Sequence, residues 1–296
     1  MDRYALRDRT DALDPETQYE EIVRILYWQE FPWDVNQALG LALFRTYAVP
    51  TIGRLLADTG EFTGQVQKRY DDTGLILDAV LEHGLGDPRG RAGVRRMNQM
   101  HGSYDISNDD MLYVLCTFVV CPIRWLEEHG WRPLTANEKR ASVNYYRELG
   151  RHMGIKQIPE TLWEFVLHLQ AYEREHFAYD EGGRAVADST LSLMTTFPPN
   201  HLLPRRAVLW FSRTLMDEPL LDAFGYRRPS RAARAVTRTA MGVRAAVERR
   251  MRPRTEPVRV RDLPQVRSYP DGYDVDRLGT FPRTCPVTGA EAPVHA

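Results

Sequence analysis

Apolar residues recur mostly at every third or fourth position, which is the period of an amphipathic α-helix. No segment shows the strict alternation of apolar and polar residues that is typical of a strand. Prolines, capping residues and glycines divide the pattern into separate helices. The predicted helices cover residues 16–28, 33–47, 50–58, 62–83, 88–101, 108–129, 135–153, 161–177, 184–197 and 205–216. We therefore expect an all-α fold, with residues 1–225 forming one large bundle-like domain.

The composition changes beyond this domain, because residues 226–261 contain 12 arginines and only 2 glutamates. Small apolar residues follow the helical period here: Val236, Ala240, Val243, Val247 and Met251. The arginines of the segment follow another stripe, so residues 227–252 are predicted to form a basic amphipathic helix. Such a helix could dock peripherally on an anionic membrane, or it could pack on the acidic body through its Ala/Val stripe. Residues 262–296 are predicted to form an irregular C-terminal tail, loose from Pro282 onward.

Composition and charge exclude several classes of protein. Among the 296 residues, 43% are hydrophobic and 27% are charged, as in ordinary globular proteins. The formal net charge of −1 argues against a nucleic-acid partner. The longest apolar stretch runs from Met111 to Ile123, which is too short to cross a bilayer as a helix. The charged start lacks the apolar region of a secretory signal, so we expect a cytoplasmic protein.

Arg69 interrupts the apolar stripe of the predicted helix 62–83. Its stripe neighbours, spaced three or four residues apart, are Val66, Thr73, Ile76 and Val80. A guanidinium stays charged at physiological pH, so burying it requires an anionic partner. That partner could be a protein carboxylate such as Asp72, or the carboxylate of a bound ligand. Thr73, one turn away, offers a hydroxyl group to the same place.

His101 ends an apolar face of the next predicted helix, where it follows Val94 and Met97 at the spacing i, i+3 and i+7. A histidine in this position is either a hydrogen-bonded core residue or an axial ligand of haem iron. Haem has apolar faces, and its propionates attract arginine. Because consecutive helices tend to pack antiparallel, one haem between them would explain both His101 and Arg69.

Other candidate chemistry is weaker. Arg124 precedes two glutamates by one turn, which indicates either a surface ion pair or a second propionate contact. Glu173 and His176 form one Glu-x-x-His motif, but a di-iron carboxylate site requires two such motifs. Three cysteines are too few for a disulfide scaffold or a four-thiolate zinc site. The sequence also lacks a phosphate-binding glycine loop and a Gly-x-Ser-x-Gly elbow.

Several motifs resemble the MpaB-type oxygenases, which share a catalytic domain with the latex clearing proteins, the rubber oxygenases of actinomycetes. The motifs lie in order within residues 35–160. They are YAVPTIGRLL at 47–56, KRYDDT at 68–73, RMNQMH at 96–101, ISNDDMLY at 106–113, PIRW at 122–125 and WRPLT at 131–135.

This resemblance implies a helical domain that encloses one haem b. The family's iron-binding histidine corresponds to His101, and its arginine and threonine correspond to Arg69 and Thr73. We expect Met97 and Arg124 as further cofactor contacts, and a carbonyl or carboxylate bonded to the far ring nitrogen of His101. The implied activity is that of a haem-dependent oxidoreductase, an oxygenase that oxidises an apolar isoprenoid-like or secondary-metabolite substrate with dioxygen, including double-bond cleavage.

Two alternatives remain open at this level. A haem enzyme of natural-product biosynthesis could hydroxylate, desaturate or couple its substrate, and a non-enzymatic protein could simply bind lipid or haem. Three departures from the family pattern bear on the choice. Asp72 replaces a lysine of the rubber oxygenases, Gly53 stands near the place of a glutamate proposed as their base, and Cys121 replaces an acid. We therefore predict different chemistry on the face of the haem opposite His101.

Overall fold

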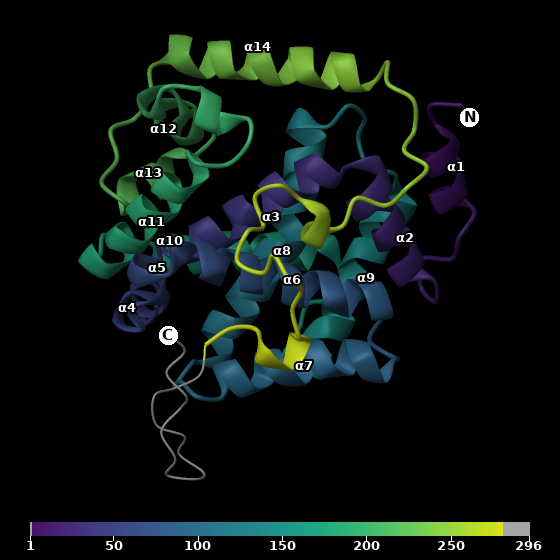
Figure 1. The fold of residues 1–296 in the computed structure, drawn as a ribbon, viewed down its shortest axis with the longest axis horizontal. Coiled ribbons are helices and arrows are strands. Elements are labelled where there is room, and N and C mark those ends of the chain that lie inside the picture. The colour runs from purple at the N-terminus through teal and green to yellow at the C-terminus, as the bar shows by residue number, and fades with distance from the viewer. Residues whose placement is uncertain (1, 281–296) are drawn as a thin grey trace.

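Helices joined by loops make up residues 2–280, the part that the computed structural model describes (Figure 1). This part contains no strand, so the predicted all-α fold class is confirmed. The α-helices are α1 (Ala5–Asp11), α2 (Tyr19–Ile25), α3 (Pro32–Thr46), α4 (Pro50–Asp58), α5 (Glu61–Gly64), α6 (Val66–His83), α7 (Pro88–His101), α8 (Asn108–His129), α9 (Ala136–His152), α10 (Leu162–His176), α11 (Glu181–Met194), α12 (Arg205–Thr214), α13 (Glu218–Ala223) and α14 (Arg231–Glu248). Short turns of other helix types are η1 (Leu26–Glu30), η2 (Asn200–Leu202), η3 (Val260–Asp262) and η4 (Val275–Arg277).

Local capping chemistry sets many of the helix boundaries. Pro50 and Pro88 stand in the first turns of α4 and α7, where a missing amide hydrogen costs nothing. Thr135 and Glu138 form the predicted capping box at the start of α9. Gly84 adopts a φ of 82° directly after α6, a conformation that other residues rarely adopt. These boundaries agree with the sequence prediction.

Other boundaries differ from the prediction. The helix expected over 62–83 is interrupted at Gln65, whose φ of −133° and ψ of 41° separate α5 from α6. The helix α11 begins three residues earlier than expected, because the carboxylate of Asp180 accepts a hydrogen bond from the amide of Gly183 and caps it. Helices α1 and α13 were not predicted, and both are short.

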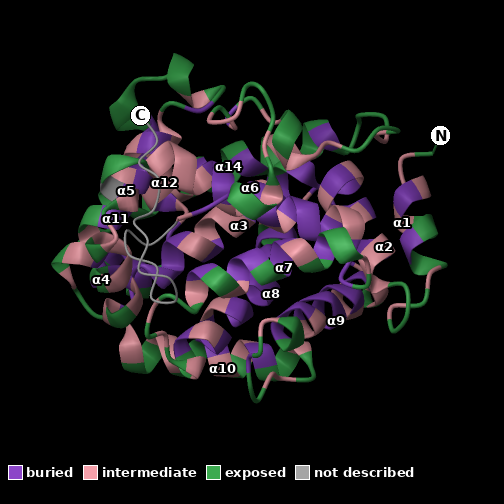
Figure 2. Cartoon of the chain, turned by 60° about the horizontal axis from the view of Figure 1, so that its bottom comes forward, coloured by how far each residue is buried: buried purple, intermediate pink, exposed green. Residues whose placement is uncertain are grey.

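The helix α8 forms the centre of the molecule and packs against α3, α9 and α10 (Figure 1). Most of its side chains are buried, as the concentration of purple along α8 in Figure 2 shows. The long apolar stretch from Met111 to Ile123 lies within this helix and supplies much of the core. Within residues 2–280, no helix is both long enough and apolar enough to span a bilayer.

Helices α4 and α11 cross in direct backbone contact. A Cβ atom placed on Gly53 would lie 2.7 Å from the Cα of Gly183 and 2.6 Å from the carbonyl oxygen of Tyr47. No side chain fits into either glycine position without moving a helix, because these neighbours are backbone atoms. The close crossing holds α11 against the helix that forms one wall of the cavity described below.

The basic helix is present as α14, but its packing differs from one of the two expectations. Val236, Val243 and Val247 are each more than half exposed, so the Ala/Val stripe does not pack on the body. Instead, the hydroxyl of Thr237 lies 2.6 Å from that of Thr214 on α12, and Arg244 contacts Asp34 on α3. These polar pairs fix a different face of α14 against the molecule.

The segment 262–280 contains no α-helix, yet it packs closely against α6 and α7. Leu278 is fully buried in the main core. Asp71 accepts hydrogen bonds from the amides of Arg267 and Ser268, at 3.0 and 2.9 Å, and another from the Ser268 hydroxyl. The rest of the predicted tail, with Cys285, lies outside the described residues.

Candidate functional site

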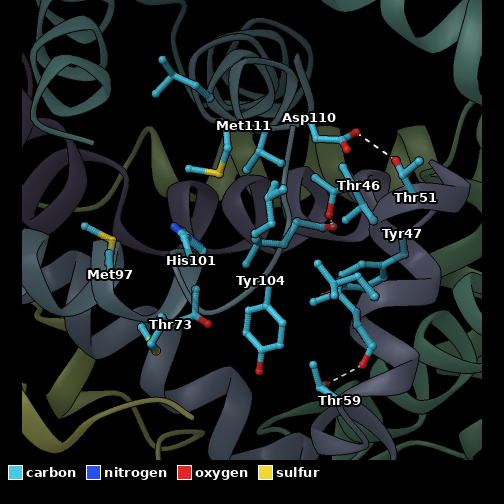
Figure 3. Close-up of a pocket in the computed structure, with 18 of the residues that line it drawn as sticks. Thr46, Tyr47, Thr51, Thr59, Thr73, Met97, His101, Tyr104, Asp110 and Met111 are labelled. Carbon is cyan, nitrogen blue, oxygen red and sulfur yellow. Dashed lines mark hydrogen bonds between the residues drawn. The ribbon is translucent and has the colours of Figure 1, made fainter. Parts of the chain in front are cut away.

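A cavity of about 870 Å³ lies among α4, α6, α7, α8 and the loop that joins α7 to α8 (Figure 3). Its volume is in the range of about 300–1,000 Å³ that is typical of ligand sites. Most of its wall is apolar, including Leu43, Ile52, Leu55, Leu56, Phe62, Val66, Ile76, Leu77, Met97, Met100, Ile106, Met111, Val114, Leu115, Phe118 and Leu149. Polar side chains also reach the wall, and Arg69, Thr73 and His101, which were predicted from the sequence, are among them.

His101, the last residue of α7, lies on the cavity wall. Its Nδ1 atom is buried and has no hydrogen-bond partner among the described residues, so the expected bond to a carbonyl or carboxylate is not found there. Burial, together with the positive charge of Arg69, lowers the pKa of His101 to about 4. The imidazole is therefore neutral near pH 7, which is the form that can bind a metal ion.

Arg69 and Thr73 reach the cavity from neighbouring turns of α6. Arg69 Nη1 donates a hydrogen bond of 2.7 Å to Thr73 Oγ1, which in turn donates to the Arg69 carbonyl at 2.9 Å. No carboxylate among the described residues forms an ion pair with Arg69. Asp72 points elsewhere, because its carboxylate accepts hydrogen bonds from Lys68 and Tyr269. Of the two partners expected for Arg69, the structure excludes Asp72.

Four of the five predicted site residues line this single cavity. Met97 is 7% exposed and lies on the same helix as His101, one turn before it. Figure 3 shows Thr73 close to His101, with Met97 beside them. The fifth residue, Arg124, is exposed on α8 and is absent from the cavity wall. The exposure of Arg124 could not be predicted, because the helical period alone does not say which side of α8 the neighbouring helices cover.

The di-iron alternative lacks a donor set in the described part of the chain. His176 lines the cavity, but Glu173 binds Arg45 through two hydrogen bonds of 2.8 and 2.6 Å. No group of three or more histidine, cysteine or acidic side chains within residues 2–280 is arranged to hold a metal ion. A haem needs only one such ligand from this side of the cavity.

The sequence analysis missed a polar cluster at the other end of the cavity from Met97 (Figure 3). Asp110 accepts hydrogen bonds from the hydroxyl groups of Tyr172 at 2.7 Å and Thr51 at 3.0 Å. All three residues line the cavity, and Asp110 is buried. In the sequence, Asp110 stands out only as part of the ISNDDMLY motif at 106–113. Its partners are about 60 residues away on α4 and α10, so no local pattern could have found them.

The departures from the family pattern also have structural explanations. Gly53 lies in the backbone contact with Gly183, where no glutamate side chain could fit. Cys121 lies outside the cavity wall, and burial raises the pKa of its thiol to about 12. The thiol therefore stays protonated and cannot replace a carboxylate. Neither position supplies an acid or a base to the cavity.

Residues 34–246, which contain most of the cavity wall and most of the helices, match the family model described as the catalytic domain of ER-bound oxygenase mpaB/B' and rubber oxygenase. The chain belongs to this family, and the resemblance inferred from its motifs is confirmed.

Three fungal relatives illustrate the similarity. The chain is 31% identical over 242 residues to ER-bound oxygenase mpaB' of Penicillium brevicompactum, covering 76% of this chain and 57% of the relative. It is 31% identical over 215 residues to ER-bound oxygenase mpaB of Penicillium roqueforti strain FM164, covering 67% of this chain and 72% of the relative. A third, mpaB of Penicillium brevicompactum, is 31% identical over 183 residues, covering 56% of this chain and 47% of the relative. The chain thus spans only part of each relative.

Proposed function

We propose that this protein is a haem b-dependent oxygenase that oxidises an apolar, isoprenoid-like or secondary-metabolite substrate with dioxygen, including cleavage of a double bond. The observation that carries this proposal is the pair formed by His101 and Arg69. A neutral imidazole and a guanidinium without a carboxylate partner face one large apolar cavity. Membership of the oxygenase family supports the same conclusion.

The side chains of the cavity fit a haem in three respects. The Nδ1 atom of His101 is buried and forms no hydrogen bond with the described residues, so they leave this ring atom available to a ligand. Arg69 offers a planar set of donors to a propionate carboxylate, which would supply the anion that it lacks. Met97 and Met100 offer polarizable apolar surface beside His101. When bound there through His101, haem would supply the activation of dioxygen, which no protein side chain can perform.

The same walls favour a hydrocarbon substrate. Leucine, isoleucine, phenylalanine, valine and methionine make up about half of the residues that line the cavity, so an apolar molecule gains the free energy of leaving water. The polar side chains include two separate groups, one with His101 and Arg69 and the other with Asp110, which would orient a bound substrate.

Asp110 is the buried carboxylate of the cavity wall. Its Oδ1 atom accepts hydrogen bonds from Tyr172 and Thr51, which hold the carboxylate in place at the cavity wall. Because the close helix contact at Gly53 leaves no room there for the glutamate proposed as the base of rubber oxygenases, we assign to Asp110 the exchange of protons with the substrate.

A second candidate function is a haem enzyme that hydroxylates, desaturates or couples a natural product. The observation that favours it is the position of Asp72, which stands where rubber oxygenases carry a lysine but binds Lys68 and Tyr269 instead. Product analysis under ¹⁸O₂ distinguishes the two. Cleavage of a double bond by dioxygen labels both carbonyl products, hydroxylation labels one hydroxyl, and desaturation labels no product.

The decisive experiment is an absorbance spectrum of the protein purified with added haem, together with an iron and pyridine-haem assay. We expect a Soret band and about one haem per chain, and we expect both to be lost in His101→Ala. The matched control is His152→Ala, since His152 lies on α9 outside the cavity wall. A wild-type protein without bound haem, or a His101→Ala variant with the wild-type spectrum, would falsify the proposal.

A further inference from the structure

The helix α14 presents an apolar face to solvent. Val236, Val243 and Val247 are 58%, 59% and 57% exposed, and Met251 just beyond the helix is 51% exposed. Ala240 lies on the same stripe and is also exposed. Apolar side chains in a continuous exposed row are uncommon on a protein that has no partner for them. Figure 1 shows α14 along the outer edge of the molecule, with α12 beneath one end.

The opposite flank of the exposed surface is basic. Successive residues of an α-helix are rotated by about 100° around its axis. Arg231, Arg238 and Arg249 therefore form a row along one edge of the solvent-facing surface, and the valines form a row along the other edge. All three are exposed, and none forms an ion pair with a described residue. Between the two rows the exposed residues are small: Ala232, Ala235, Thr239, Gly242 and Ala246.

The helix has almost no compensating negative charge. Residues 227–252 contain nine arginines and one acidic residue, Glu248. Glu248 is 6% exposed and binds Arg244 at 2.9 Å on the side that faces the molecule. The solvent-facing surface of α14, all of which the structure describes, therefore has no acidic side chain.

The neighbouring helix α12 carries a partly exposed tryptophan. Trp210 on α12 is 43% exposed and lies one turn before Thr214, whose hydroxyl meets that of Thr237 on α14. Leu202 and Leu203, which precede α12, are 76% and 56% exposed. Tryptophan is the side chain that most favours the boundary between lipid and water, because its ring is apolar and its nitrogen is a donor.

We propose that the exposed face of α14, with Trp210 at its side, docks the enzyme on the surface of a bilayer that contains anionic lipids. The valine row would enter the boundary between headgroups and acyl chains, while the arginines would bind lipid phosphates and carboxylates. The small residues between the rows allow the helix to lie close to the headgroups. Charge complementarity selects this occupant, since the face offers guanidinium groups and aliphatic surface but no acidic group to pair with a basic partner.

Co-sedimentation with phospholipid vesicles tests the proposal on the full chain. We expect binding to vesicles of 70% phosphatidylcholine and 30% phosphatidylserine, with at least a tenfold loss of affinity for pure phosphatidylcholine and a similar loss in 0.5 M NaCl. The double variants Val243→Asp/Val247→Asp and Arg238→Glu/Arg249→Glu should each bind at least tenfold more weakly. Leu167→Asp on α10 and Arg91→Glu/Arg95→Glu on α7 are matched controls at exposed positions and should bind normally.

A second measurement avoids dependence on disruptive substitutions. An environment-sensitive fluorophore on Val243→Cys should shift to the blue when anionic vesicles are added, whereas the same label on Leu167→Cys should not. The proposal is wrong if the wild-type chain does not bind the anionic vesicles, or if the Val243→Asp/Val247→Asp variant binds them as well as the wild type. It is also wrong if that variant changes only the oligomeric state, which would make the face an interface between two copies of the chain.

Discussion

Placing the charged guanidinium of Arg69 at the wall of this cavity costs free energy unless an anion binds to it. Its guanidinium bonds to Thr73 and lies 5.4 Å from the ring of Phe62, but no described carboxylate neutralises it. The same charge helps to keep the pKa of His101 low. Both effects suit a ligand that brings a carboxylate to Arg69 and a metal to the neutral imidazole.

Replacing this charge should weaken the hold on haem without abolishing it. We expect Arg69→Leu to retain haem about tenfold less tightly, because a hydrogen-bonded ion pair with a propionate is lost while His101 remains. Transfer of haem to apomyoglobin, followed at the Soret band, measures the difference. Arg95→Leu, at an exposed site on α7, is the control and should behave like the wild type. If both variants retain haem equally tightly, Arg69 does not contact the cofactor.

The buried carboxyl group of Asp78 should make the stability of the fold depend on pH. Burial raises the pKa of this carboxyl to about 6, although the indole of Trp28 donates a hydrogen bond to it at 2.9 Å. A raised pKa means that the folded state binds the proton more tightly than the unfolded state. The stability that comes from the protonated form is therefore complete below about pH 4 and is lost as the pH rises through 6.

Asp78→Asn should remove this dependence, since asparagine keeps an acceptor for Trp28 but carries no charge. Between pH 5 and pH 8, the free energy of unfolding of the wild type should fall by about 1–2 kcal/mol relative to the variant. Urea unfolding at both values measures it, with the exposed Asp262→Asn as control. A constant difference between the wild type and Asp78→Asn across this range would contradict the assignment.

At the scale of whole elements, capping residues predicted the helices best. Pro50, Pro88 and Thr135 act through local backbone chemistry, so the boundaries they set were predicted directly. The break at Gln65 and the short helices α1 and α13 depend on tertiary contacts, which periodicity does not reveal. Periodicity also left open which face of α14 packs on the body, because Thr237 and Arg244 find partners there that their polarity did not suggest.

The candidate site also contains residues that the sequence predicts and residues that only tertiary contacts reveal. Arg69, Thr73, Met97 and His101 were predictable because consecutive antiparallel helices bring their stripes together. The Asp110 cluster was not predictable, because it joins three helices that are distant in the sequence. Arg124 was assigned from a motif whose orientation only the packing of α8 decides.

The crossing of α4 and α11 leaves no room for added volume. We expect Gly53→Ala to cost about 1–3 kcal/mol, because its methyl group would meet backbone atoms that cannot move independently. Gly242→Ala in α14 is the matched control. Its added methyl group meets nothing within 4 Å, so it should stabilise the helix by about 0.5–1 kcal/mol. Thermal and urea unfolding measure both, and a harmless Gly53→Ala would contradict the close approach.

At the scale of the whole molecule, the segment 262–280 connects the end of the described chain to its core. Arg96 on α7 donates hydrogen bonds to the carbonyl oxygens of Leu278 and Thr280, at 2.6 and 2.9 Å, and Thr280 lines the cavity. Lys68 on α6 donates to the carbonyl of Gly279. The segment thus completes the cavity wall from outside the bundle.

Asp71 is the residue that should test this attachment. We expect Asp71→Ala to lower the free energy of unfolding by about 2–4 kcal/mol, since the donors from Gln67, Arg267 and Ser268 lose their acceptor. Limited proteolysis should then cut within residues 263–280 faster than in the wild type. Asp271→Ala, exposed in the same segment, is the control. If the two variants are cut alike, the segment is held by other contacts.

The place of this segment in the chain has a consequence for biosynthesis. The ribosome makes the helices α4 to α10 before residues 262–280, so these walls of the cavity leave the exit tunnel earlier than the segment that covers them. A ligand of the cavity could therefore enter while the side of α6 and α7 is still uncovered. Residues 262–280 would then pack over a site that is already filled.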